Sequence, residues 1–231
     1  VGDKGIRGIT ISIGKRMSDI EVEGDTVRAG AGALLSKTAN AALNESLSGM
    51  EFAAGIPGSV GGAVLMNAGA YGGEIKDILY EAHVLTPTGV VKCMSAGELD
   101  LSYRHSILMD EGGIVLSAIF QLQKGDYDSI KSTMQELNKR RADKQPLNYP
   151  SAGSTFKRPE GYYAGKLIED AGLRGYRVGG AMVSDKHCGF VINADNATAL
   201  DVRNLMTDVS DKVFNDSGVR LEPEVRFIGE F

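Results

Sequence analysis

Residues 51–75 read EFAAGIPGSVGGAVLMNAGAYGGEI and contain seven glycines and one proline. Glycine loses much backbone entropy on folding, so it is kept where φ must be positive or where another group comes close to the backbone. The amides of GIPGSVGGA (55–63) could therefore face an anion or the polar edge of a planar ring. They could equally form tight turns and close strand crossings that serve packing alone. Spacing does not decide between these two interpretations.

Two common nucleotide-binding patterns are missing from the chain. No Gly-Lys-Ser/Thr follows the glycine-rich stretch, so it is not a Walker loop. GxGxxG is also absent, so the dinucleotide fingerprint of the Rossmann fold has no support here.

Composition limits the classes of partner. A chain of 231 residues with 42% hydrophobic and 24% charged residues is typical of a globular protein. Its net charge of −5 argues against a nucleic-acid-binding surface. No apolar run reaches membrane-spanning length, and the N-terminus lacks the pattern of a signal peptide. We therefore expect no nucleic acid, no membrane and no obligate protein partner.

The two cysteines, Cys93 and Cys188, are too few and too far apart for a disulfide scaffold or a zinc knuckle, which indicates a cytoplasmic, reducing setting. The three histidines show no metal-ligand spacing, so we predict no metal site. We interpret His83 as a strand residue and Cys188 as a small core residue.

Hydrophobic periodicity and turn residues predict an α+β protein of two parts, with a boundary near residue 124. In the first part, residues 1–123, we expect strands over 8–14, 19–24, 26–32 and 112–122, a helix over 33–46 and a hairpin over 80–94. In the second part, residues 124–231, we expect helices over 127–144, 163–172 and 198–216, and strands over 176–184, 188–194 and 221–229. Asp126 is the expected N-cap of the helix that Pro146 ends.

Ser154 lies in the small-residue segment SAGSTFKRP, which predicts a turn. It has no GxSxG context, so a hydrolase nucleophile is excluded. A serine hydroxyl can still donate a proton when its neighbours make it acidic enough. From this segment alone, an ordinary serine-rich turn is the favoured interpretation.

Charged residues in two further segments are candidates for binding a carboxylate. Arg104 in LSYRHS could hold one in bidentate fashion, or could form a surface salt bridge. In LEPEVRF, a strand would place Glu222, Glu224 and Arg226 on one face, which either lines a cleft or faces water.

Four segments, in this order, closely resemble the family of UDP-N-acetylenolpyruvoylglucosamine reductases: AGIPGSVGGAVLMNAGAYGGEI, LSYRHS, AGSTFKRP and LEPEVRFIG. The resemblance covers the whole chain. It implies a FAD-binding domain of the vanillyl-alcohol-oxidase/PCMH type, followed by a smaller α+β substrate-binding domain. It also implies FAD as cofactor and NADPH as hydride source, for reduction of UDP-N-acetylglucosamine enolpyruvate to UDP-N-acetylmuramate in peptidoglycan synthesis.

The resemblance also implies roles for single residues. Ser154 matches the proton donor, and Arg104 and Glu224 match the pair that polarises the substrate carboxylate. The implied substrate-binding residues are Tyr103, Arg141, Lys144 and Arg158. The implied cofactor-binding residues are Gly55, Ile56, Pro57, Gly58, Ser59, Gly61, Gly62, Ala63, Asn67, Gly69, Ala70 and Gly72.

Two departures from the family pattern accompany the resemblance. No insertion with a substrate-closing tyrosine lies between Phe120 and Ser151, so the chain resembles the shorter class of the family. A preceding segment with a strand and a phosphate-binding loop is absent, so we expect the chain as given to bind FAD weakly.

Two other functions remain as alternatives. One is a flavin-dependent oxidoreductase of the same superfamily that acts on an alcohol or a sugar. The other is a non-catalytic module that binds a nucleotide sugar.

Overall fold

A computed structural model describes residues 1–231 and divides into two compact units. The N-unit is Ile11–Arg141, and the C-unit is Ala142–Phe231 together with Val1–Thr10. None of the helices is both long and apolar enough to cross a bilayer.

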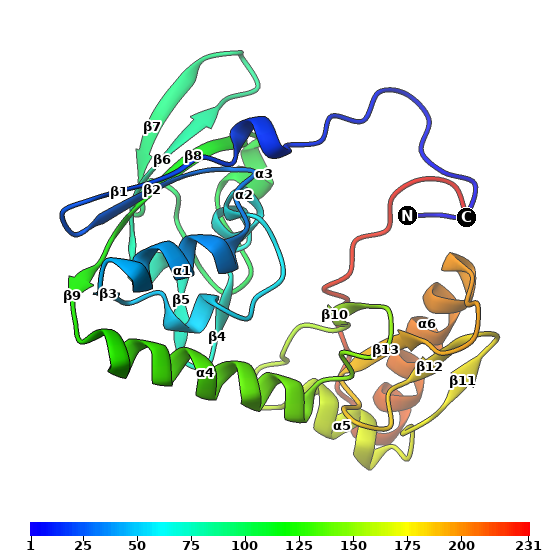
Figure 1. Cartoon of the computed structure of the whole chain (residues 1–231). Coiled ribbons are helices and arrows are strands. Elements are labelled where there is room, and N and C mark those ends of the chain that lie inside the picture. Colours follow the sequence, from blue (N-terminus) through cyan, green and yellow to red (C-terminus); the bar gives the residue numbers. More distant parts are fainter. The chain divides into compact units, whose positions relative to one another are not determined.

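The N-unit is built on an antiparallel five-stranded sheet in the order β1-β2-β8-β6-β7 (Figure 1). Its strands are β1 (Ile20–Glu23), β2 (Thr26–Gly30), β6 (Leu79–Leu85), β7 (Val91–Ser95) and β8 (Ile114–Gln121). The core lies on one face of the sheet, where alternate strand residues such as Val27, Val84 and Phe120 are fully buried. Helices α1 (Leu35–Asn44) and α2 (Val60–Leu65) contribute Leu35 and Val64 to the same core.

The remaining N-unit elements are short. They are η1 (Lys15–Met17), β3 (Leu47–Ser48), η2 (Glu51–Ala53), β4 (Gly69–Ala70), β5 (Gly73–Glu74), η3 (Ile75–Asp77), α3 (Leu108–Glu111) and β9 (Gln123–Lys124).

Helix α4 (Tyr127–Lys144) is the predicted helix, with the predicted cap. The Asp126 carboxylate accepts hydrogen bonds from the backbone N–H and the hydroxyl of Ser129, which lower the pKa of Asp126. The predicted boundary near residue 124 differs from the observed division between Arg141 and Ala142. The reason is that Ile130 and Met134 of α4 are buried in the N-unit core.

The C-unit holds a four-stranded antiparallel sheet in the order β10-β13-β12-β11. Its elements are β10 (Ser151–Ser154), α5 (Ala164–Asp170), β11 (Arg177–Val178), β12 (Ala181–Val183), β13 (Phe190–Asn193) and α6 (Ala199–Ser217). Leu205 and Val209 of α6 pack with Ile168 of α5 and Val183 of β12 in the core. Helix α6 begins with a capping box between Thr198 and Asp201.

Three predicted strands are wrong. Residues 176–184 form two short strands, β11 and β12, that pair with each other. Residues 8–14 form no strand, and Ile9 and Ile11 are 94% and 80% exposed. Residues 221–229 form only an isolated bridge between Pro223 and Phe156. Alternation of residue types is not sufficient for a strand, because every strand needs a partner for its N–H groups, and proline supplies no N–H.

Candidate functional site

The glycine-rich stretch folds into several short elements of the N-unit. The Ser59 hydroxyl accepts a hydrogen bond from the Gly62 N–H and caps α2. Strands β4 and β5 then form a hairpin whose two loop residues, Tyr71 and Gly72, both have positive φ, at 54° and 92°. This is the requirement of a type I′ turn.

Four of the glycines lie close to neighbouring residues. A Cβ on Gly61 would lie 2.9 Å from the Cβ of Ala31, and one on Gly73 would lie 2.6 Å from the ring of Phe52. Gly69 and Gly55 are similarly confined, with contacts of 2.8 Å and 2.5 Å. At Gly61, Gly69 and Gly73 close packing excludes a side chain, whereas at Gly55 a side chain would meet the end of the Asn138 side chain.

Three other glycines border open space. A Cβ on Gly58 or Gly72 would meet nothing within 4 Å, and one on Gly62 would meet only the Ser59 hydroxyl at 3.7 Å. Close packing therefore does not explain these glycines, although the turn of the β4–β5 hairpin requires the positive φ of Gly72. The ligand-binding interpretation of the stretch stays a prediction.

A cavity of about 290 Å³ lies beside α2. Ser59, Gly61 and Gly62 of the glycine-rich stretch form part of its wall, and apolar side chains such as Ile13, Leu65 and Ile114 form other parts. Its volume is close to the lower end of small-molecule sites, about 300–1,000 Å³. An apolar cavity with glycine backbone in its wall fits a flat, largely apolar ring such as that of a flavin, and it does not enclose a whole dinucleotide.

Arg104 occupies a strained turn. Ser102 and His105 exchange backbone hydrogen bonds, so Tyr103 and Arg104 form the tip between them. Arg104 has φ 56° at the third position of this turn, where glycine is usual. Such conformations persist only when the surroundings enforce them, and they concentrate at functional sites.

Three contacts fix this turn beside the glycine-rich stretch. The Asn67 amide donates to Ser102 O at 3.0 Å, and the Ser106 hydroxyl donates to Leu65 O at 2.7 Å. The Arg104 guanidinium reaches Gly69 O through Nη2 at 3.5 Å. The guanidinium is thus positioned within the N-unit next to the segment that lines the cavity.

Asn67 connects the glycine-rich stretch to the Arg104 turn. Its side chain is fully buried, donates to Glu74 Oε2 at 2.5 Å as well as to Ser102 O, and accepts from the Lys76 N–H at 2.9 Å. These hydrogen bonds hold the Asn67 side chain inside the protein, where it positions the Arg104 turn, and the role of Asn67 in cofactor binding stays a prediction. Sequence reasoning missed the positioning role, because the partners are distant in sequence.

Arg141, near the end of α4, lies against the same stretch. Its Cδ is 3.3 Å from the position of a Cβ on Gly55. Burial lowers the pKa of Arg141, whereas the nearby Tyr71 acts in the opposite direction. A partly desolvated guanidinium next to glycine backbone is suited to holding an anionic group.

In the C-unit, the segments that carry Ser154 and Glu224 are joined through the backbone of Thr155. Ser154 is exposed and ends β10 after an irregularity at Gly153, which has φ 85°. The buried Thr155 accepts a hydrogen bond from the Glu224 N–H at its carbonyl, at 2.9 Å. The predicted serine-rich turn is therefore a strand end.

The backbone pairing of this segment gives Glu222 and Glu224 different surroundings, although strand alternation predicted that they share one face. Glu222 forms an ion pair with Lys157, and its carbonyl accepts from the Lys157 N–H at 2.8 Å. Glu224 is half-buried, whereas Glu222 and Arg226 are exposed. The predicted common face of these three residues is wrong, because the segment is not a strand.

Two further cations belong to the C-unit. The guanidinium of Arg158 lies 4.0 Å from the ring centroid of Tyr163, and its Nε donates to Tyr162 O at 3.2 Å. Lys144 is exposed at the end of α4. Burial lowers the pKa of His187, and the charge of Lys144 contributes in the same direction.

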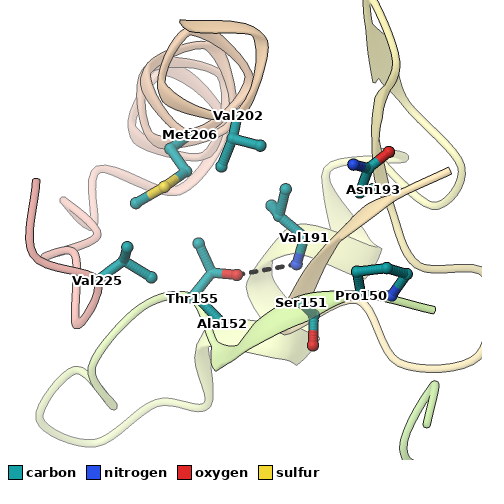
Figure 2. A pocket seen from close by; sticks show the side chains of 9 residues that line it. All are labelled: Pro150, Ser151, Ala152, Thr155, Val191, Asn193, Val202, Met206 and Val225. Atoms are coloured by element: carbon teal, nitrogen blue, oxygen red, sulfur yellow. Dashed lines mark hydrogen bonds between the residues drawn. The ribbon is translucent and has the colours of Figure 1, made fainter. Parts of the chain in front are cut away.

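A second cavity, of about 280 Å³, lies inside the C-unit and was not predicted (Figure 2). Val202 and Met206 of α6 face Thr155, Val191 and Val225 across it. The Thr155 hydroxyl accepts a hydrogen bond from the Val191 N–H at 2.8 Å, drawn in Figure 2. The wall of this apolar cavity includes Ser151 and Thr155. Ser154 is not part of the wall.

Comparisons with known proteins agree with this arrangement. A model of a FAD-binding domain matches residues 1–94. A model of the C-terminal domain of UDP-N-acetylenolpyruvoylglucosamine reductase matches residues 145–228. The predicted order of a FAD-binding domain and a smaller α+β domain is confirmed.

Curated relatives cover the chain from end to end. UDP-N-acetylenolpyruvoylglucosamine reductase of Agathobacter rectalis is 60% identical and matches 100% of this chain and 77% of its own length. The enzyme of Lachnoclostridium phytofermentans is 59% identical, with 100% and 76% covered.

A solved structure matches as well. The crystal structure of the reductase (MurB) from Thermus caldophilus superposes with a TM-score of 0.79 at 38% identity, covering 87% of this chain and 72% of that one. The resemblance found in the four sequence segments is thereby confirmed. The chain belongs to the UDP-N-acetylenolpyruvoylglucosamine reductase family.

Proposed function

We propose that the protein is a FAD- and NADPH-dependent oxidoreductase that reduces UDP-N-acetylglucosamine enolpyruvate to UDP-N-acetylmuramate for peptidoglycan synthesis. Family membership at 60% identity over the whole chain supports this activity. The structural observation that carries it furthest is the hydrogen bond from the Glu224 N–H to Thr155 O, which ties the segment that carries Glu224 to the residue next to Ser154.

The cavity of the N-unit is the proposed place of the flavin ring. Residues of the glycine-rich stretch would hold it through their backbone: Gly55, Ile56, Pro57, Gly58, Ser59, Gly61, Gly62, Ala63, Gly69, Ala70 and Gly72. Among these, Gly58, Gly62 and Gly72 border open space and allow the closest approach. When bound there, FAD would supply the hydride-transfer chemistry between NADPH and the enolpyruvyl double bond.

Arg104 of the N-unit and Glu224 of the C-unit are the residues that the resemblance implies for the substrate carboxylate, and each is proposed for that role. Electrons move toward the substrate carboxylate when hydride reaches the double bond, so negative charge grows there. A preorganised guanidinium stabilises that charge, and the enforced turn at Arg104 supplies the preorganisation. Glu224 contributes by sharing a proton with the enol form of the carboxylate.

Ser154 is the proposed proton donor. Its hydroxyl delivers a proton to the carbon next to the carboxylate, which completes the lactyl ether of the product. The exposure of Ser154 at the end of β10 leaves the hydroxyl accessible to a substrate.

The remaining polar residues are proposed to hold the nucleotide sugar. Arg141, Lys144 and Arg158 would bind phosphate groups as cations, and Tyr103 would contact the substrate from the tip of the Arg104 turn. We also propose a cytoplasmic location, because both cysteines are free and remain so in a reducing compartment.

The test is an assay of NADPH oxidation by the full-length protein with and without UDP-N-acetylglucosamine enolpyruvate. We expect a flavin spectrum and NADPH oxidation that depends on this substrate. A flavin spectrum with oxidation driven only by an alcohol or a sugar would instead indicate a different oxidoreductase. Tight binding of the UDP-sugar by a protein without flavin would indicate a binding module, and either result would overturn the proposal.

A further inference from the structure

Three potential metal ligands lie together on the face of the N-unit sheet opposite its core. Glu81 and His83 alternate with the buried Ala82 and Val84 along β6, so both lie on that opposite face. Cys93 on β7 is the direct cross-strand partner of His83. One carboxylate oxygen, one imidazole nitrogen and the thiol sulfur all lie within 4.8 Å of one another.

The spacing of the histidines in the sequence does not show this juxtaposition. His83 and Cys93 are separated by the loop of the β6–β7 hairpin, and no short metal-binding motif contains them. The hairpin register alone pairs the two residues, and the alternation along β6 adds Glu81. The spacing of histidines, on which the prediction of no metal site rests, does not show proximity of this kind.

We propose that Glu81, His83 and Cys93 form a binding site for a zinc-like transition metal ion, with water completing the coordination. Thiolate and imidazole select zinc, cobalt and similar ions over Mg²⁺ and Ca²⁺, which prefer oxygen ligands. Ligand bonds of about 2.0–2.3 Å place neighbouring ligand atoms of a tetrahedron about 3.3–3.8 Å apart. Small rotations of the three side chains close the difference from 4.8 Å.

The surroundings of the three ligands suit this role. Ser117 on β8 holds the His83 ring through a hydrogen bond between its hydroxyl and Nδ1, at 3.0 Å. Partners of this kind orient metal-binding histidines and fix the tautomer. If Nδ1 keeps this hydrogen bond, the ring coordinates through Nε2.

The Cys93 thiol currently shares its proton with a neighbour. It hydrogen-bonds to Glu81, which raises the pKa of Cys93, and Glu98 adds further negative charge nearby. A divalent cation would replace that proton, convert the thiol to a thiolate and neutralise part of this negative charge. Cys93 is exposed, so the ion can enter from solvent.

The ion would tie the edge strand to its neighbour. Strand β7 is joined only to β6, and most of its residues are exposed. A metal bridging Cys93 to His83 and Glu81 adds a second link between these strands, which form the long hairpin in Figure 1. We therefore expect metal binding to slow hydrogen exchange in β7 without affecting the C-unit.

The test uses Co²⁺ as a probe in the full-length protein under thiol-free reducing conditions, with Zn²⁺ as competitor. We expect one Co²⁺ per chain, a thiolate-to-cobalt charge-transfer band and displacement by Zn²⁺. Cys93→Ser and His83→Gln should each weaken binding at least about 100-fold, and Ser117→Ala about 10- to 100-fold with the band retained. Cys188→Ala is the matched control, because Cys188 is the other free cysteine and is buried elsewhere, and it should leave binding unchanged.

Several results would overturn the proposal. They are the absence of a thiolate band in the wild-type protein, a band that persists in Cys93→Ser, or a band lost in Cys188→Ala. A stoichiometry of one metal per two chains would also contradict it, because the ion would then be shared between exposed cysteines of two copies.

Discussion

Glu222 and Glu224 differ by two positions, yet the structure gives them different surroundings. Glu222 is exposed and paired with Lys157, whereas Glu224 is half-buried and tied to Thr155 O through its N–H. Removing the charge of Glu224 should therefore affect the chemical step alone. We predict that Glu224→Gln lowers kcat about 100- to 1,000-fold, as loss of a preorganised stabilising group does. Glu222→Gln should change kcat by less than about threefold, since an exposed ion pair contributes little. Steady-state kinetics check both, and equal losses in the two variants would refute the assignment of Glu224.

Ser154 makes its contribution after the flavin has been reduced. We predict that Ser154→Ala is reduced by NADPH at the wild-type rate, while turnover with the enolpyruvyl substrate falls about 100- to 10,000-fold. Rapid-mixing absorbance of the flavin separates the two steps. Ser151→Ala is the control from the same strand and should behave as wild type. Near-normal turnover of Ser154→Ala would remove Ser154 from the mechanism.

The turn that carries Arg104 depends on a hydrogen bond from Asn67, which lies in a different segment of the chain. Asn67→Ala would leave the buried partners of the amide without hydrogen bonds, at about 1–3 kcal/mol for each such group. We predict a lower free energy of unfolding and a lower kcat, because Arg104 loses its enforced position. Denaturant unfolding and kinetics measure the two effects. Asn40→Ala, on the exposed side of α1, is the control and should change neither by much.

His187 makes the C-unit sheet sensitive to acid. Its Nδ1 accepts a hydrogen bond from the Gly189 N–H at 3.1 Å, just before β13, and burial lowers its pKa below the ordinary 6.5. A protonated ring cannot accept that hydrogen bond. The unfolded chain binds the proton more readily than the folded chain, so stability should fall as pH decreases from about 6.5 toward the folded-state pKa.

Denaturant unfolding of the C-unit above and below this pH measures the dependence. His187→Asn should reduce the slope, whereas His105→Gln in the N-unit should leave the slope of the C-unit unchanged. A slope that is the same in wild type and His187→Asn would show that other groups cause it.

Helices and hairpins whose signals lie close together in the sequence could be predicted. The cap at Asp126 and the hairpin over 80–94 involve residues close together in the sequence, and α4, α6 and the β6–β7 hairpin were found. The strands predicted over 8–14 and 221–229 failed because their sequence patterns cannot show whether a partner exists. The order β1-β2-β8-β6-β7, with β8 between β2 and β6, is likewise a result of distant pairing.

At the scale of the whole molecule, the family could be recognised from four short segments, but the supporting contacts could not. Asn67, which the resemblance assigns to the cofactor, also holds the Arg104 turn, and Thr155 was not singled out although it joins Glu224 to the Ser154 strand. Both act through backbone atoms of residues far away in sequence. The Glu81, His83 and Cys93 cluster depends instead on the register of the β6–β7 hairpin, which the spacing of histidines does not show.

The reductase assignment is tested most directly by a single-turnover experiment without oxygen. The flavin of the full-length protein is reduced with one equivalent of NADPH, and UDP-N-acetylglucosamine enolpyruvate is then added while flavin absorbance and product mass are followed. We predict that the flavin is reoxidised and that the product is heavier than the substrate by one hydride and one proton. A reduced flavin that persists in the presence of bound substrate, with no change in its mass, would contradict the account.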